Sequence, residues 1–140
     1  MKCYADSSFI TAFYINEPFT ARAQKLATGR CPLPFTPWHR LEVRNAIRCA
    51  VTAEKAKASI QLLEQDLRDE AVVFHHTIDW IDCLRRAEDL SKNYNPRIGV
   101  SSSDLFHVAC ALELEFAEFF SFDRRQTDLA KAVGLKVKGL

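Results

Sequence analysis

The sequence predicts an α/β fold, a three-layer α/β/α sandwich with a central, mostly parallel sheet of four or five strands. Short apolar segments typical of buried strands alternate with longer segments of helical periodicity, and this alternation favours parallel strands joined by crossover helices. The chain has 140 residues, 48% of them hydrophobic, with no internal repeat and no linker-like composition. We therefore expect one ordered domain that spans residues 1–140.

The first half of the chain contains two predicted strands and four predicted helices. A short strand over residues 2–5 precedes Ser7 or Ser8, which suits the cap of a helix over residues 8–15. Pro18 favours the first turn of a helix over residues 19–28, which Gly29 ends. There follow a strand over residues 30–36, a helix that begins at Pro37, and a helix over residues 53–70 whose apolar stripe is Ile60, Leu63 and Leu67.

The second half repeats the alternation. A strand over residues 71–75 leads to Thr77, the expected cap of a helix over residues 78–94. The expected apolar face of that helix consists of Ile78, Ile81, Leu84 and Leu90, and a loop with Asn95, Pro96 and Gly99 follows it. The remaining elements are a helix from about Ser103, a strand over residues 119–122, a helix from about Arg124 that ends at Gly134, and a strand over residues 135–139.

Four acidic residues occur where such a fold gathers polar side chains. Asp104 opens an apolar helix and Asp123 follows an apolar strand, while Asp6 follows the first strand and Glu42 lies one turn into the helix after PLPFT. A helix that feeds the next parallel strand begins at the carboxyl edge of the sheet, where ligands of open α/β sheets bind. Taken singly, Asp6 or Asp104 is better explained as a helix cap, and for Asp123 a cap and a metal ligand are equally good explanations. Together the four predict a metal site.

The chemistry of this site favours Mg²⁺, with Mn²⁺ as a substitute. Carboxylates that converge repel one another unless a cation neutralises them. Hard divalent ions prefer oxygen ligands, and no His or Cys cluster at zinc-ligand spacing accompanies the acids. A pair of such ions activates water and stabilises a departing oxygen, so phosphodiester hydrolysis is the expected reaction.

The arrangement of these motifs resembles the PIN domain, specifically the toxin ribonucleases of VapBC-type toxin–antitoxin pairs. The resemblance covers essentially the whole chain. It depends on YADSSFI, HRLEVRNAI, SSSDLFHVACALEL and FFSFDRRQTDLAKAVGLKV, in which a hydroxyl residue, Ser121, stands two positions before the last acid. Threonine is more usual at that position, and the serine-rich run before Asp104 is also unusual.

The resemblance implies a magnesium-dependent endoribonuclease. Asp6 and Asp104 would hold the principal metal, and Glu42 and Asp123 would complete the site directly or through water. Ser121 and Ser7 would act as supporting hydroxyl groups. The implied partners are an RNA substrate, a cognate antitoxin protein and a second copy of the chain in a homodimer.

Basic residues near the acids are candidates for RNA contact. Arg40 and Arg44, with Arg48, recur every four residues on the helix of Glu42, and Arg97 and Arg124 flank the other acids. An ordinary solvated helix face explains each arginine equally well. The formal net charge is only +1, so a nucleic acid would have to be held by a local surface.

Two other functions are compatible with the sequence. A PIN-like module could mainly bind a partner protein, with latent or absent nuclease activity, and a neighbouring gene for a DNA-binding antitoxin would favour the toxin instead. A phosphotransfer protein of receiver or phosphatase type also uses aspartates and magnesium at strand ends, but it needs paired early acids and a lysine directly after a late strand, a combination that this chain lacks.

The remaining features indicate a reduced, cytoplasmic protein. No apolar run approaches the roughly 20 residues needed to cross a bilayer, so no membrane association is expected. The five cysteines are widely spaced, without a C-x-x-C pair. Cys49 and Cys110 are expected to be buried in helices as small apolar side chains.

Overall fold

The computed structural model describes residues 2–140, and the chain forms two compact units. The first unit contains residues 2–6 and 78–140, and the second contains residues 7–77. All five expected strands are present, and every strand pair is parallel. The prediction of a helix-rich α/β fold with a parallel central sheet is confirmed. The strands pair as one ladder of three and one ladder of two.

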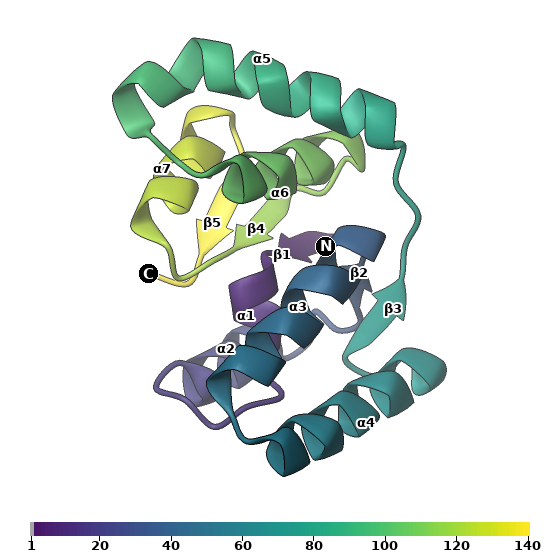
Figure 1. Ribbon diagram of the computed structural model, residues 1–140. Helices are drawn as coiled ribbons and strands as arrows, with labels where there is room; N and C mark the ends of the chain where they lie inside the picture. The colour runs from purple at the N-terminus through teal and green to yellow at the C-terminus, as the bar shows by residue number, and fades with distance from the viewer. Residues whose placement is uncertain (1) are drawn as a thin grey trace. The chain divides into compact units, whose positions relative to one another are not determined.

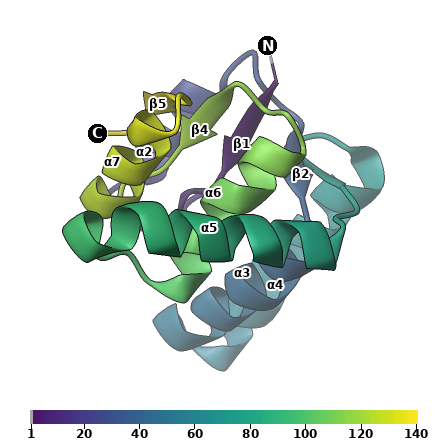
Figure 2. The same cartoon turned by 90° about the horizontal axis from the view of Figure 1, so that it is seen from above.

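The first unit is built on the ladder β1-β4-β5, with β4 in the middle (Figure 1). Tyr4 of β1 pairs with Phe119 of β4, which in turn pairs with Val137 of β5. Its elements are β1 (Cys3–Ala5), α5 (Trp80–Ile98), α6 (Ser102–Glu113), β4 (Glu118–Phe120), α7 (Arg124–Ala132) and β5 (Lys136–Lys138). Helix α5 packs against α6 and crosses it in the view from above (Figure 2). Tyr4, Phe119 and Phe120 are fully buried, so this ladder forms the core of the unit.

The second unit combines a two-stranded ladder with four helices. Phe35 of β2 pairs with His75 of β3, and α3 packs against α1 and α4. Its elements are α1 (Ser7–Thr11), α2 (Thr20–Ala27), β2 (Leu33–Phe35), α3 (Pro37–Ala50), α4 (Ala53–Asp69) and β3 (Val73–His75). The expected stripe of α4 is buried at Leu63 and Leu67 and half-buried at Ile60.

Helix α1 is shorter than the sequence predicts. It begins at Ser7 itself and ends at Thr11 rather than at residue 15. The Thr11 hydroxyl donates to the Ser7 carbonyl oxygen, and the backbone N–H groups of Phe13 and Tyr14 bond three residues back. These tighter bonds replace the regular helical pattern.

Helix α5 differs most from expectation. Its cap is Asp79, which accepts from the backbone N–H of Asp82, rather than Thr77. The helix also continues through Pro96 to Ile98. The Asn95 side chain bonds both the N–H and the carbonyl oxygen of Val100, and Gly99 adopts a φ of 72°, so the expected loop residues instead fasten the end of the helix.

The buried face of α5 was also predicted wrongly. Ile81 and Leu84 are 63% and 55% exposed, whereas Cys83 and Leu90 are buried. Ile78 and Leu90 are twelve positions apart, which at about 100° per residue rotates them by roughly 120°, so the expected set does not form one stripe. No helix among residues 2–140 combines the length and apolar character needed to cross a bilayer.

Candidate active site

The Asp6 carboxylate lies at the carboxyl end of β1 and contacts the loop after β4. The Asp6 backbone N–H donates to the Phe120 carbonyl oxygen, which extends the ladder by one residue. The Ser121 hydroxyl lies 2.6 Å from Asp6 Oδ2, a short distance typical of a hydroxyl donating to a carboxylate. Asp6 is only 4% exposed and Ser121 is fully buried, so this bond compensates part of the cost of burying the carboxylate. The predicted role of Ser121 as a supporting hydroxyl has a structural basis here.

Gln126 connects Ser121 to the helix that carries Asp104. The Gln126 Oε1 atom lies 2.9 Å from the Ser121 hydroxyl oxygen, and Gln126 Nε2 donates to the Asp104 carbonyl oxygen at 3.3 Å. Asp104 itself occupies the first turn of α6, where the Ser101 hydroxyl caps its backbone N–H. A carboxylate in this position also interacts favourably with the helix dipole.

Asp123 caps α7, as one of the two explanations of this residue predicted. Its Oδ1 accepts from the Gln126 backbone N–H at 2.8 Å, and its own backbone N–H donates to the Ser121 hydroxyl oxygen at 3.0 Å. The Asp123 side chain is exposed. Asp6, Asp104 and Asp123 are thus connected through Ser121 and Gln126 within the first unit.

Glu42 belongs to the second unit, on α3. The Ser7 hydroxyl donates to Glu42 Oε1 at 2.8 Å, and Ser7 follows Asp6 directly in the chain. Helix α3 is fixed at its start by Thr36, which exchanges hydrogen bonds with the backbone and the ring of the buried His39. Ser7, the second predicted supporting hydroxyl, therefore contacts Glu42, whereas the sequence motif associated it with the neighbouring Asp6.

The four candidate RNA-binding arginines divide into two groups. Arg40 and Arg44 both pair with Glu64 of α4, and the Arg44 side chain is only 19% exposed. Burial, together with the like charges of Arg40 and Arg48, lowers the pKa of Arg44. Arg97 and Arg124 are exposed in the first unit, where Arg124 follows Asp123 directly. Glu64 thus neutralises part of the α3 stripe, whereas Arg97 and Arg124 face solvent.

Histidine and cysteine, two residue types that often take part in catalysis, occur in the core of the first unit. His107 is buried, and its Nδ1 lies 2.7 Å from the Tyr4 hydroxyl, which agrees with a structural imidazole. Cys110 is buried as expected, but Cys49 is exposed, which contradicts its predicted burial. Burial raises the pKa of the Cys83 and Cys110 thiols and so disfavours their reactive thiolate forms.

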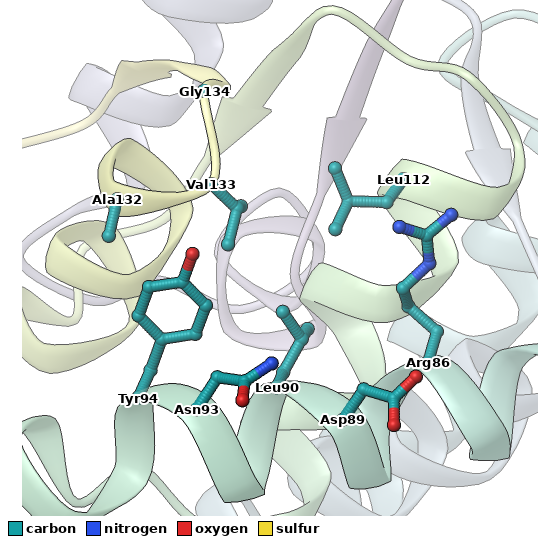
Figure 3. A pocket seen from close by; sticks show the side chains of 9 residues that line it. All are labelled: Arg86, Asp89, Leu90, Asn93, Tyr94, Leu112, Ala132, Val133 and Gly134. Carbon is teal, nitrogen blue, oxygen red and sulfur yellow. The ribbon is translucent and has the colours of Figure 1, made fainter.

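The described residues contain no preformed metal cage. Among residues 2–140, no three His, Cys, Asp or Glu side chains are grouped so that they could hold an ion. None of the four candidate acids lines the cavity of about 640 Å³ in the first unit, whose lining side chains are shown in Figure 3. Leu90, Asn93 and Tyr94 rise into it from α5 and face Val133 and Gly134 in the turn after α7. The candidate site is thus a hydrogen-bonded edge rather than a deep pocket.

The sequence analysis missed two residues that support this edge. Gln126 stands three positions after Asp123, a D-x-x-Q pattern that signals a helix start but does not reveal where the Gln side chain goes. Gly139 has a φ of 134°, and a Cβ atom built there would lie 1.9 Å from the Ser121 carbonyl oxygen. Only glycine permits this close approach.

Comparisons with known proteins agree with this architecture. A family model described as PIN domain matches residues 3–132. The toxin VapC20 of Mycobacterium tuberculosis, described as cleaving the sarcin-ricin loop, aligns with a TM-score of 0.72 and 17% identity over 98% of this chain and 99% of that chain. A search of curated proteins found no match.

Two other solved structures are similar. FitAcB from Neisseria gonorrhoeae aligns with a TM-score of 0.68 and 12% identity, over 96% of this chain and 95% of that chain. VapBC2 from Rickettsia felis, bound to a DNA fragment from its promoter, aligns with a TM-score of 0.68 and 9% identity, over 99% of this chain and 98% of that chain. At these identities the likeness concerns the fold alone.

Proposed function

The chain belongs to the PIN-domain family, and from this premise we propose that it is a metal-dependent endoribonuclease, the toxin of a toxin–antitoxin pair. The observation that carries the proposal is the series of contacts from Asp6 through Ser121 and Gln126 to the main chain of Asp104. This series joins segments that are far apart in sequence at one edge of the ladder. A buried network of polar contacts between distant segments is typical of a functional site.

The proposed cofactor is Mg²⁺, for which Mn²⁺ can substitute. Asp6, Asp104, Glu42 and Asp123 would supply the carboxylate oxygens that these hard ions prefer. Carboxylates repel one another when no cation is bound, so their side chains need not be gathered at ligand distance beforehand. A bound divalent cation would supply an activated water and stabilise the charge of the departing oxygen.

The chain's own residues would orient the metal-binding carboxylates and bind the RNA. Ser121 holds Oδ2 of Asp6 and so directs the other carboxylate oxygen away from the hydroxyl. Ser7 does the same for Glu42. Arg97 and Arg124, both exposed, would contact RNA phosphates, and Arg40 and Arg44 would do so from α3 beside Glu64. Because the four acids come from both units, we further propose that residues 1–140 act as one PIN-like domain in the cytoplasm.

The partners of the neighbouring structures support an antitoxin for this chain. VapBC2 is described with a DNA fragment from its own promoter, as expected for a toxin held by a DNA-binding partner. We propose a cognate antitoxin, and a homodimer of the toxin chain. A second candidate function is a PIN-like binding module with latent or absent nuclease activity. The exposed apolar side chains of Leu41 and Leu62, 61% and 53% accessible on α3 and α4, favour such partner binding.

The test is RNA cleavage by the purified protein in Mg²⁺ or Mn²⁺, in excess chelator, and after the metal is restored. Cleavage should require the metal. Asp104→Asn should reduce it by more than the roughly 10- to 100-fold that loss of an outer-shell partner costs. Asp128→Asn is the matched control, since Asp128 lies exposed on α7.

Wild-type activity in excess chelator would refute the metal mechanism. If the folded protein binds an antitoxin but cuts no RNA under any of these conditions, the binding module is the better description.

A further inference from the structure

We propose that Gln126 is the positioning residue of the acid site, which holds Ser121 and the first turn of α6 in the register that metal binding requires. The proposal rests on the proposed metal-dependent function and extends it to a residue that is not itself acidic. Gln126 is fully buried, although glutamine is mostly exposed in proteins. A buried amide must find partners for both its N–H₂ group and its oxygen.

The two ends of the Gln126 side chain contact different parts of the site. Nε2 donates to the Asp104 carbonyl oxygen in the first turn of α6, and Oε1 faces the hydroxyl of Ser121, after β4. Its own backbone N–H is held by the Asp123 carboxylate. One residue therefore connects the end of β4, the start of α6 and the start of α7. Each of these segments carries or contacts one of the acids.

Ser121 shows how this arrangement orients Asp6. The Ser121 oxygen accepts from the Asp123 backbone N–H, which leaves its single proton for another acceptor. Among residues 2–140, two acceptors lie within hydrogen-bond distance of that hydroxyl, Asp6 Oδ2 at 2.6 Å and Gln126 Oε1 at 2.9 Å. One proton serves only one acceptor at a time, and the shorter distance favours Asp6. Gln126 therefore acts on Ser121 as the alternative acceptor and by limiting the positions that its hydroxyl can take.

Other residue types cannot replace this pattern. Leucine has a similar volume but offers neither a donor nor an acceptor, so the Asp104 carbonyl oxygen would lose its donor and the Ser121 hydroxyl would lose its alternative acceptor. Glutamate keeps an acceptor but loses the N–H₂ donor that reaches Asp104, and it adds a charge to a group of acids. Both substitutions should leave α7 in place, because the Asp123 cap uses the backbone N–H of residue 126.

The test compares Gln126→Leu and Gln126→Glu with Thr127→Val. Thr127 is the matched control because it is a buried neighbour on α7 whose hydroxyl donates only to the Arg124 carbonyl oxygen. For each protein, the Mn²⁺ concentration at half-maximal rise in melting temperature is measured, together with kcat and KM for RNA cleavage. Circular dichroism checks the fold.

We expect Gln126→Leu to shift the Mn²⁺ midpoint upward by roughly 10- to 100-fold, as for loss of an outer-shell partner, and to lower kcat rather than raise KM. Gln126→Glu retains the acceptor beside Ser121, so it should disturb the orientation of Ser121 less than Gln126→Leu does. It loses the donor to Asp104, so it should also shift the Mn²⁺ midpoint upward. Thr127→Val should match the wild type in both readouts. Equal midpoints for Gln126→Leu and Thr127→Val would overturn the positioning role and leave the nuclease proposal intact. A wild type that binds Mn²⁺ without cutting RNA would refute the nuclease, while the Mn²⁺ midpoints would still decide the role of Gln126.

Discussion

The position of Ser121 depends on two uncharged neighbours, Gln126 and Gly139. Gln126 faces its hydroxyl, and Gly139 lies against its backbone. The positions of Asp6, Asp104 and Asp123 at a strand end and at helix starts could be predicted from the sequence, because strand and helix boundaries indicate the sheet edge. Their supporting residues could not be predicted, since a glutamine in a helix and a glycine near β5 have many ordinary roles and their contacts depend on tertiary structure.

Substitution of Gly139 by alanine should disturb Ser121. The added Cβ atom would overlap the Ser121 carbonyl oxygen, and alanine disfavours a φ of 134°. We expect a loss of about 1–3 kcal/mol in the free energy of unfolding, measured in denaturant, with reduced cleavage. Gly134→Ala is the control, because its φ is also positive at 93° but nothing lies within 4 Å of the added atom. Equal losses for both variants would show that backbone conformation alone, not the contact with Ser121, limits residue 139.

At the scale of elements, the strands and most helices could be predicted, while the orientation of α5 could not. Apolar residues lie on several sides of α5, so periodicity did not identify the side that packs on α6. Trp80 illustrates this, since it is 43% exposed and still stacks on the buried Phe106 at 5.5 Å. The ion pairs of Arg40 and Arg44 on α3 were not predictable for a related reason, because their partner Glu64 comes from another helix.

The corrected face of α5 predicts unequal effects of two leucine truncations. Leu90→Ala removes a buried side chain and should lower the free energy of unfolding by about 2–5 kcal/mol. Leu84→Ala removes an exposed side chain and should change it by no more than about 0.5 kcal/mol. Denaturant unfolding of both variants measures the difference. Similar losses in the free energy of unfolding would support the buried face that the sequence predicted.

A hydrogen bond between the segment after α1 and helix α4 should make stability sensitive to alkaline pH. The Tyr14 hydroxyl donates to Asp66 Oδ2 at 2.8 Å, and burial, followed by this bond and the charge of Asp66, raises the pKa of Tyr14 above its usual value of 10.0. Above pH 10 the unfolded chain releases a proton that the folded chain keeps, so the free energy of unfolding falls as pH rises.

The contribution of Tyr14 to this slope is about 1.4 kcal/mol per pH unit. Tyr14→Phe should remove that contribution, as measured by denaturation between pH 9 and pH 11, at the cost of one hydrogen bond at neutral pH. Tyr94→Phe, on α5, should keep the slope. An unchanged slope in Tyr14→Phe would show that Tyr14 ionises equally in the folded and unfolded chains.

At the scale of the whole molecule, the four acids of the proposed site are distributed over both units. Asp6, Asp104 and Asp123 belong to the first and Glu42 to the second, and Ser7, which donates to Glu42, directly follows Asp6. The fold class and the PIN family were accessible from the sequence, because the order of the acidic motifs extends over nearly the whole chain. How the four carboxylates would surround an ion in the proposed site was not accessible, since it depends on side-chain rotations that a cation would control.

A crystal structure of the protein grown with Mn²⁺, with the anomalous signal of the metal measured, tests the central claim most directly. We predict a manganese peak bonded to carboxylate oxygens of Asp6 and Asp104, with Glu42 and Asp123 coordinating directly or through water. A fully ordered site without a peak at these residues, or with manganese bound only elsewhere, would contradict the account.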